Sequence, residues 1–138
     1  MFVVQLHLKI VTPEKVIVDD TVDMVTLTSA EGELGILPHH VALMAKLLPG
    51  ELRIKKGGKT EVLATGDGFI QVADNTLTIL TDLAVNEAEI NEKEVENARK
   101  RAESALEQKL SDEEYAETLA VLEKSLAQLK IKRRHKVR

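Results

Sequence analysis

The sequence predicts an α+β protein in two parts: an N-terminal antiparallel β-sandwich or barrel over residues 1–84, then an antiparallel two-helix hairpin over residues 87–138. Three observations predict it. Apolar residues recur with a period of two before residue 84 and with a helical period after it. All seven glycines and all three prolines lie at or before Gly68, so the last 70 residues lack both strong turn formers. A chain of 138 residues can bury one core beside a small second element.

Short strands are indicated by alternating apolar and polar residues. The segments LHLKI (6–10), VTLT (25–28) and TLTIL (76–80) each place every second side chain on one apolar face. Two turn signals lie near them, KKGGKT (55–60) and ADNT (73–76), because glycine, aspartate and asparagine tolerate the positive φ of tight hairpins. Several short strands at close spacing predict a sandwich or barrel.

Two amphipathic helices are predicted after the strands. Asn91 with Glu94 and Ser111 with Glu114 have the spacing of capping boxes, so helices should begin near 91 and 112, with a break around Leu110. The first apolar stripe is mostly alanine and buries little area, so we expect a weakly held hairpin that permits a second conformation. The two stripes are Val95, Ala98, Ala102, Ala105 and Leu106, and then Tyr115, Leu119, Leu122, Leu126 and Leu129.

Composition excludes several classes of protein. The chain has no cysteine, which removes disulfide frameworks, thiol nucleophiles and thiolate metal sites and fits a reducing compartment. No apolar run approaches the ~20 residues of a membrane span. The first residues, MFVVQLHLKIV, lack the basic region and cleavage site of a signal peptide, so we expect a soluble protein.

A basic tail follows an acidic body. The last nine residues, KIKRRHKVR, hold six of the 19 lysines and arginines and no acid, so the preceding residues carry a formal charge of −10. Such a run is typical of nucleic-acid binding, but only 2% of the residues are aromatic and bases would find few stacking partners. The other interpretation is a solvated helix end whose cations complement the helix dipole.

The stretch EGELGILPHH (31–40) contains residue types used in turns, metal sites and catalysis. Gly32 and Gly35 supply backbone freedom at a turn, and Pro38 restricts the exit from the following strand. His39 and His40 are adjacent, so on an extended chain they point to opposite faces and do not suit one metal ion. An acid and a histidine without an activated nucleophile do not specify a reaction. A polar loop presented by a rigid sheet indicates a docking surface instead.

A first motif at residues 32–40, followed by a second at residues 68–80, resembles the epsilon subunit of bacterial-type F-type ATP synthases. The likeness covers nearly the whole chain. In the second motif Asp67 stands where the family has its first glycine. The segment DEEYAETLAVLEKSLAQLK (112–130) is similar to the second helix of the family. The first motif is matched by Gly32, Glu33, Leu34, Gly35, Ile36, Leu37, Pro38 and His40, and the second by Gly68, Phe69, Val72, Asn75, Leu77, Thr78, Ile79 and Leu80.

The resemblance implies a non-catalytic rotor subunit, peripheral on the cytoplasmic face of the cell membrane as part of the F1 sector. It implies that Glu31 and Glu33 face the polar loops of the membrane c-ring, and that Pro38, His39 and His40 lie against the gamma subunit. The hairpin would regulate the motor, because its extended position places the second helix in the catalytic alpha/beta head and blocks hydrolysis. The regulatory cations that would meet acidic surface there are Arg133, Arg134, Lys136 and Arg138.

Some members of the family bind ATP through a motif at the start of the first helix, aided by a later arginine. Here Ile90 and the later Arg101 are retained, but Asn91 replaces the acid, Glu94 the arginine and Val95 the alanine. A carboxylate where a phosphate needs a cation is repulsive. We therefore expect no ATP binding and no cofactor.

Two alternatives stay open on the residues alone. A nucleic-acid-binding module would rest on the basic tail, although we expect no nucleic-acid partner, and it would lose binding steeply with salt. A small β-sandwich metalloenzyme would rest on Glu31, Glu33, His39 and His40 and would retain stoichiometric zinc, although we expect no metal.

Overall fold

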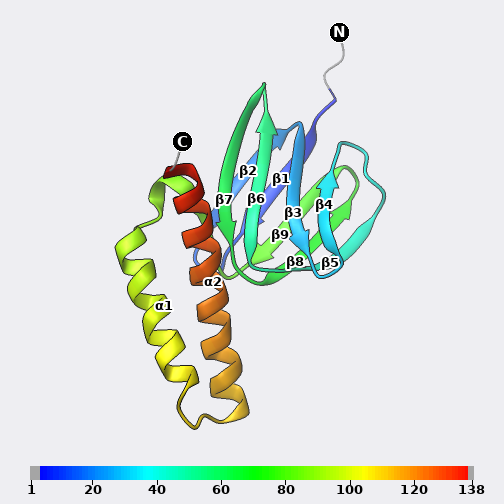
Figure 1. Cartoon of the computed structure of the whole chain (residues 1–138). Coiled ribbons are helices and arrows are strands. Elements are labelled where there is room, and N and C mark those ends of the chain that lie inside the picture. Colours follow the sequence, from blue (N-terminus) through cyan, green and yellow to red (C-terminus); the bar gives the residue numbers. More distant parts are fainter. Residues whose placement is uncertain (1–3, 137–138) are drawn as a thin grey trace.

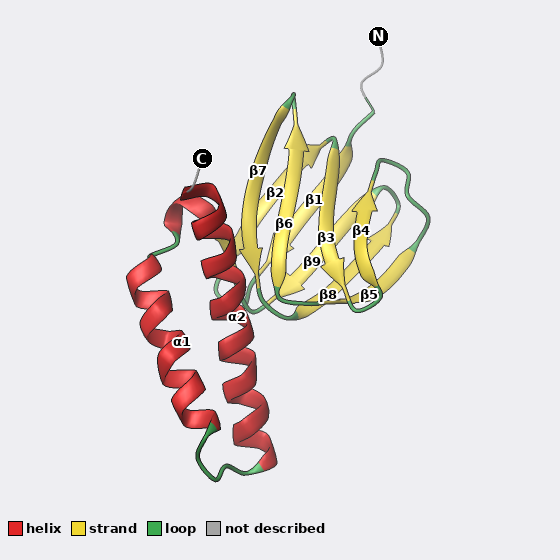
Figure 2. Cartoon of the chain, viewed as in Figure 1, coloured by secondary structure: helices red, strands yellow, loops and turns green. Residues whose placement is uncertain are grey.

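The computed structural model describes residues 4–136, in which a β-sandwich precedes a hairpin of two helices (Figure 1 and Figure 2). This confirms the predicted fold class. A short 3-10 turn, η1 (Glu87–Glu89), joins the last strand to the helices α1 (Glu92–Leu106) and α2 (Asp112–Lys136). The strands are β1 (Leu6–Val11), β2 (Val16–Val22), β3 (Met24–Ser29), β4 (Gly32–Ile36), β5 (Leu43–Leu47), β6 (Gly50–Lys56), β7 (Lys59–Thr65), β8 (Gly68–Ala73), β9 (Thr76–Thr81) and β10 (Ala84–Asn86).

The strands follow one hydrogen-bonded path, β10-β7-β6-β3-β5-β8-β9-β1-β2, with β4 paired to β3. The path folds over at a corner where Ser29 of β3 pairs with Leu47 of β5, which puts β10, β7, β6, β3 and β4 in one layer and the other strands behind it (Figure 1). One pair departs from the predicted antiparallel arrangement, because β1 runs parallel to β9. These strands lie at opposite ends of the β region, and an alternating pattern carries no information on the direction of a distant partner.

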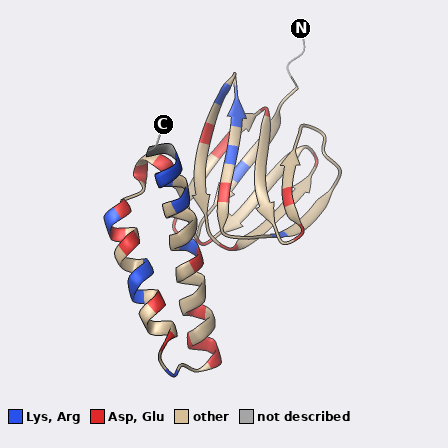
Figure 3. Ribbon diagram, viewed as in Figure 1, with Lys and Arg blue, Asp and Glu red and all other residues tan. Residues whose placement is uncertain are grey.

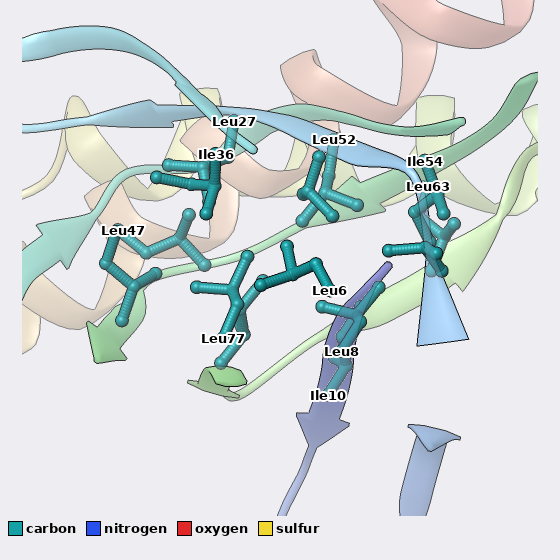
Figure 4. Packing of buried hydrophobic residues seen from close by; sticks show 14 of the residues in the cluster. Leu6, Leu8, Ile10, Leu27, Ile36, Leu47, Leu52, Ile54, Leu63 and Leu77 are labelled. Carbon is teal, nitrogen blue, oxygen red and sulfur yellow. The ribbon is translucent and has the colours of Figure 1, made fainter. Parts of the chain in front are cut away.

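The core lies between the two layers, where the alternating patterns point one face of each strand inward (Figure 4). In β1 the side chains of Leu6, Leu8 and Ile10 are fully buried while His7 and Lys9 face solvent. The same alternation buries apolar residues on β3 and β9, so the strand predictions are confirmed. The inward set also contains Val22, Val25, Leu27, Ile36, Leu47, Leu52, Ile54, Leu63, Ile70, Val72, Leu77, Ile79 and Ala84.

Both predicted turns connect antiparallel strands. Gly57 and Gly58 join β6 to β7 with φ of 59° and 78°, and Asp74 and Asn75 join β8 to β9 with φ of 50° and 56°. Two successive positive φ values match the right-handed twist of the strands that such turns connect. The turn predictions are therefore confirmed.

Both helices begin at the predicted caps. The Glu94 N–H donates to Oδ1 of Asn91 at 3.2 Å, so Asn91 caps α1. At α2 the capping box is complete: the Glu114 N–H donates to Oγ of Ser111 at 3.1 Å, and the Ser111 N–H donates to Oε1 of Glu114 at 3.3 Å. Leu110 lies in the connection between the helices, as predicted.

The predicted apolar stripe of α2 is only partly correct. Leu129 is buried, whereas Tyr115 and Leu126 are about half exposed, and the other buried positions are Ser125 and Ile131. The helix has two neighbours, α1 and the sandwich, and it meets them on different sides (Figure 1). A single stripe of residues three and four apart describes only one contact face, so the pattern could not predict the second.

The C-terminal half of α2 lies against the sandwich, while the other end of the hairpin extends beyond it (Figure 1). Ile131 is 1% exposed and forms a small cluster with Ala64 of β7 and Ile90. We call this the docking cluster; Val62, Val85 and Val95 pack around it. The cluster is separate from the core of the sandwich.

The predicted domain boundary at residue 84 falls at the first residue of β10. This strand pairs with β7 through residue 86, so the sandwich runs into the segment before the hairpin. Separate folding of residues 1–84 and 87–138 stays a prediction. Among residues 4–136 no helix has the length and apolar character that crossing a membrane requires.

Candidate docking and regulatory surfaces

The three residues predicted to contact the gamma subunit lie in one turn after β4. The His40 N–H donates to the Leu37 carbonyl at 3.1 Å, with Pro38 and His39 between them. Pro38 precedes a residue of positive φ, since His39 has φ of 63°, which is the pattern of a type II turn. Nδ1 of His40 lies 2.8 Å from the Val41 carbonyl. A carbonyl only accepts, so Nδ1 is the donor in this contact.

Several large apolar side chains in this turn, just after it and on the outer surface of the sandwich are exposed. They are 53–77% exposed, and they come from the turn, from β5 and from the neighbouring strands β8 and β9. Phe69 and Leu80 are direct cross-strand partners, and Met44 lies diagonally across from Phe69 on the next strand. Met44, Phe69 and Leu80 are therefore neighbours on one outer surface, and an exposed apolar patch is typical of a protein-binding surface. This outer apolar face consists of Leu37, Val41, Met44, Phe69 and Leu80.

The two acids predicted to face the c-ring lie at the β3–β4 hairpin. Gly32 has φ of 115° in this hairpin, and the Glu31 N–H donates to Oγ of Ser29 at 3.2 Å. Glu33 is exposed, and its Oε1 accepts from Arg53 at 3.3 Å. An exposed pair of this kind is worth about 0–1 kcal/mol, so Glu33 can exchange Arg53 for another polar partner at little cost.

The residues of the metalloenzyme alternative are not brought together. Glu31 and Glu33 lie at one end of β4, and His39 and His40 follow its other end. Five residues of strand span about 16 Å, too far for one metal ion to bridge. Within the described part of the chain no three acidic or histidine side chains form a group that could hold a metal.

The basic end of α2 pairs with acids of this same chain. Figure 3 shows basic residues gathered at the C-terminal end of α2, with acidic residues in its first turn. Arg133 lies 3.1 Å from Glu92 and 2.5 Å from Glu96 on α1, while Arg134 pairs with Glu51 of β6. These carboxylates raise the pKa of both arginines. The side chain of Lys136 and the whole of Arg138 lie outside the described residues.

A second ion pair holds the middle of α2 to the sandwich. Nζ of Lys124 lies 2.7 Å from Oδ2 of Asp82, over the backbone of Gly66. A Cβ at Gly66 would collide with the Asp82 carboxylate and lie 2.9 Å from Cδ of Lys124, so a larger residue there would displace these two side chains. The hairpin is therefore docked on the sandwich by the docking cluster and by the ion pairs of Lys124 and Arg134, which lie on either side of Ile131 along α2.

The residues of the nucleotide motif have structural roles or lie apart. Ile90 is 5% exposed in the docking cluster, and Asn91 caps α1. Arg101 is exposed on α1, ten residues beyond Asn91, which is about 15 Å along the helix axis. These three side chains do not converge on one site.

Sequence reasoning missed the outer apolar face and the docking contacts. Phe69 and Met44 occupy positions that the alternating pattern assigns to solvent, and an apolar residue there was the available signal. No local pattern indicated Lys124 with Asp82, which are 42 residues apart.

A β-sandwich with an exposed apolar outer face and a docked helical hairpin is typical of a protein-binding subunit. Residues 5–87 match the family model described as the ATP synthase, Delta/Epsilon chain, beta-sandwich domain. The chain belongs to the ATP synthase epsilon chain family. It is therefore a non-catalytic subunit of an ATP synthase, and neither the nucleic-acid module nor the metalloenzyme is supported.

Relatives and solved structures agree with this assignment. The ATP synthase epsilon chain of Herpetosiphon aurantiacus is 40% identical over 126 residues, covering 91% of this chain and 93% of that one. The epsilon chain of Chloroflexus aggregans is 39% identical over 133 residues, 96% of each chain. A chain in the cryo-EM structure of the Euglena gracilis mitochondrial ATP synthase, comprising OSCP, F1 and the c-ring, superposes with a TM-score of 0.75 at 26% identity, covering 92% of this chain and 81% of that one.

Proposed function

We propose that the chain couples the gamma subunit to the c-ring in the central stalk and regulates ATP hydrolysis through its hairpin. The observation that carries the proposal is the outer apolar face beside the turn of Pro38, His39 and His40. The sandwich transmits torque, and a core filled from both layers gives it the stiffness that this requires.

The gamma subunit covers the outer apolar face in this proposal. Met44 and Val41 are more than three-quarters exposed, and burying large apolar side chains against a partner contributes about 1.5–3 kcal/mol each. The polar edge of the same contact is supplied by His40, whose ring is oriented by the bond from Nδ1 to the Val41 carbonyl. An apolar centre with a polar rim is the usual composition of a protein interface.

The c-ring contact is proposed at Glu31 and Glu33. Both acids are exposed on the short hairpin of β3 and β4, and β4 is a free edge strand of the sandwich. The weak Arg53 pair leaves Glu33 ready to bind the polar loops of the ring. Because the β3–β4 hairpin and the turn after β4 lie at opposite ends of one strand, the two partners can bind at the same time.

The hairpin is proposed to alternate between the docked position described above and an extended position in the catalytic alpha/beta head. Tyr115 and Leu126 of α2 are 46–48% exposed in the docked position, which leaves apolar area for a second partner. Extension separates Arg134 from Glu51 of the sandwich, and separation of α2 from α1 also releases Arg133 from Glu92 and Glu96, so both cations can then reach acids of the head. Lys136 and Arg138 extend the same charge run in the sequence.

The subunit is proposed to be peripheral on the cytoplasmic face of the membrane, in the F1 sector, and to bind no ATP. Millimolar ATP should leave the melting temperature of the full chain unchanged, whereas a ligand at 100 times its dissociation constant adds about 2.7 kcal/mol of stability. The matched gain-of-function variant combines Asn91→Asp, Glu94→Arg and Val95→Ala. An ATP-dependent rise in the wild type that Arg101→Ala removes would contradict this prediction.

Rebinding to a synthase depleted of its epsilon chain tests the proposal. A charge at the centre of the outer apolar face, Met44→Asp or Phe69→Asp, should weaken binding by at least tenfold, because the partner must then bury a carboxylate. Val121→Asp places the same charge on an exposed apolar position of the hairpin and should bind the gamma subunit as the wild type does. Equal binding by all three variants would refute the proposed gamma surface.

A further inference from the structure

Asn75 connects three segments of the sandwich through one amide group. Its Oδ1 accepts from the His39 N–H at 2.7 Å, and its Nδ2 donates to the Gln5 carbonyl at 2.8 Å. A backbone N–H only donates and a carbonyl only accepts, so these partners set the orientation of the amide. Its own backbone carbonyl accepts from the His7 N–H at 3.1 Å. Asn75 therefore bonds both the start of β1 and the turn after β4.

The bond to His39 falls on a residue in an unfavourable conformation. His39 occupies the third position of a type II turn with φ of 63°, where glycine or asparagine is strongly preferred. A bulky residue persists there only when its surroundings hold it. Its backbone N–H is held by Asn75, 36 residues away in the sequence. A side chain from the β8–β9 hairpin thus bonds the strained residue of the turn.

The requirement for a tight turn does not by itself account for Asn75. Asp74 occupies the preceding position of the same turn with φ of 50°, and its side chain is exposed. Either residue suits positive φ, but at Asn75 the side chain also spans to two other segments. The pair supplies a matched comparison, because substitution by glycine relieves the same backbone strain at both positions.

We propose that Asn75 is a positioning residue for the gamma interface. Its amide holds His39 in the left-handed conformation and thereby presents Leu37, His40 and Val41 in the geometry that the gamma subunit binds. This rests on the proposed gamma contact and adds to it a residue outside the contact surface. Pre-organisation of a loop raises affinity because less conformational entropy is lost on binding.

The test is the affinity of full-length variants for a catalytic head that contains the gamma subunit and lacks its epsilon chain. Asn75→Gly should weaken binding about fivefold or more, since a net hydrogen bond of about 1 kcal/mol corresponds to that factor. Asp74→Gly should change it less than about twofold. Asn75→Asp keeps an acceptor for the His39 N–H while losing the donor to Gln5, so it should stay close to the wild type.

A double-mutant cycle with His39→Gly separates positioning from general loss of stability. Glycine adopts positive φ without help, so in the His39→Gly background Asn75→Gly should change the affinity less than about twofold. Hydrogen exchange at the His40 amide should also be faster in Asn75→Gly than in Asp74→Gly, because its bond to Leu37 closes the turn.

Two results would overturn the proposal: wild-type affinity in Asn75→Gly, or the same loss of affinity with and without His39→Gly. If the wild-type chain fails to bind a head that contains the gamma subunit, the proposed gamma contact itself is refuted, and the positioning role falls with it. A loss of affinity that disappears in the His39→Gly background supports the positioning role.

Discussion

Replacing Ile131 by alanine should release the hairpin from the sandwich without unfolding either part. Ile131 is 1% exposed in the docking cluster, and that cluster is separate from the core of the sandwich. The substitution removes three carbons, worth about 0.8 kcal/mol each in transfer free energy, and leaves a cavity in addition. A loss of about 2–4 kcal/mol shifts the ratio of docked to undocked molecules by about 30- to 1,000-fold.

Energy transfer between two dyes measures this shift directly. The chain has no cysteine, so Lys59→Cys at the start of β7 and Gln108→Cys at the far end of the hairpin provide the only thiols. Transfer should change in Ile131→Ala, and the melting of the sandwich should not. Leu126→Ala removes the same number of carbons from a position that is 46% exposed and serves as the control. Unchanged transfer in Ile131→Ala would refute the docking role of this cluster.

Three further predictions concern charge, pH and the domain boundary. Arg134→Glu should lower the ratio of docked to undocked molecules about fivefold, and adding Glu51→Arg in a double variant should restore that ratio. The difference between Arg134→Glu and the wild type should shrink in 1 M salt. Dye transfer that is the same in the wild type and in both variants would contradict the role of this ion pair. Hydrogen bonds from Arg99 on α1 and from Arg133 near the end of α2 lower the pKa of Glu96 in the folded protein. The contribution of Glu96 to the stability of the hairpin is therefore present above about pH 4.3, the ordinary pKa of glutamate, and is lost as the pH falls through the lowered folded value. Far-ultraviolet circular dichroism should therefore show acid loss of hairpin helicity that Glu96→Gln reduces, and identical acid titrations would count against this linkage. Residues 1–84 should melt cooperatively, and residues 1–90, which complete β10, should melt at a higher temperature; non-cooperative melting of both would show that the sandwich is not an independent unit.

Those features of the fold that depend on neighbouring residues could be predicted from the sequence. The alternation at Leu6, Leu8 and Ile10 follows from the two-residue period of a strand, and the turn at Gly57 and Gly58 from the positive φ that glycine tolerates. The caps of both helices followed for the same reason, since a cap and its partner are three residues apart.

Contacts between distant residues could not be predicted in this way. The parallel pairing of β1 with β9 and the ion pair between Lys124 and Asp82 each join segments far apart in the sequence. Tyr115 and Leu126 matched a helical stripe, but the direction in which α2 meets two neighbours left them half exposed. Local periodicity identifies an apolar face, and only the tertiary arrangement decides what covers it.

At the proposed gamma surface, too, local features could be predicted from the sequence and contacts between distant residues could not. The sequence predicted that Pro38 restricts the exit from a strand, and the structure shows a turn of Pro38, His39 and His40 at that place and adds the outer apolar face. The bond between Asn75 and this turn was hidden, because it joins the β8–β9 hairpin to the connection between β4 and β5, 36 residues away in the sequence. Ile90 of the nucleotide motif lies in the docking cluster, but its place in the motif did not indicate that it contacts Ala64 and Ile131.

The most direct test of the central claim is purification of the tagged full-length chain from its native membranes under mild detergent, with quantification of what accompanies it. The proposed function predicts the gamma subunit, the c-ring and the alpha and beta subunits in the proportions of a single synthase. Met44→Asp should lose all of these together, and Val121→Asp should retain them. Recovery of the chain without the gamma subunit, or equal recovery of partners with both variants, would contradict the assignment of the sandwich as the link between gamma and the c-ring.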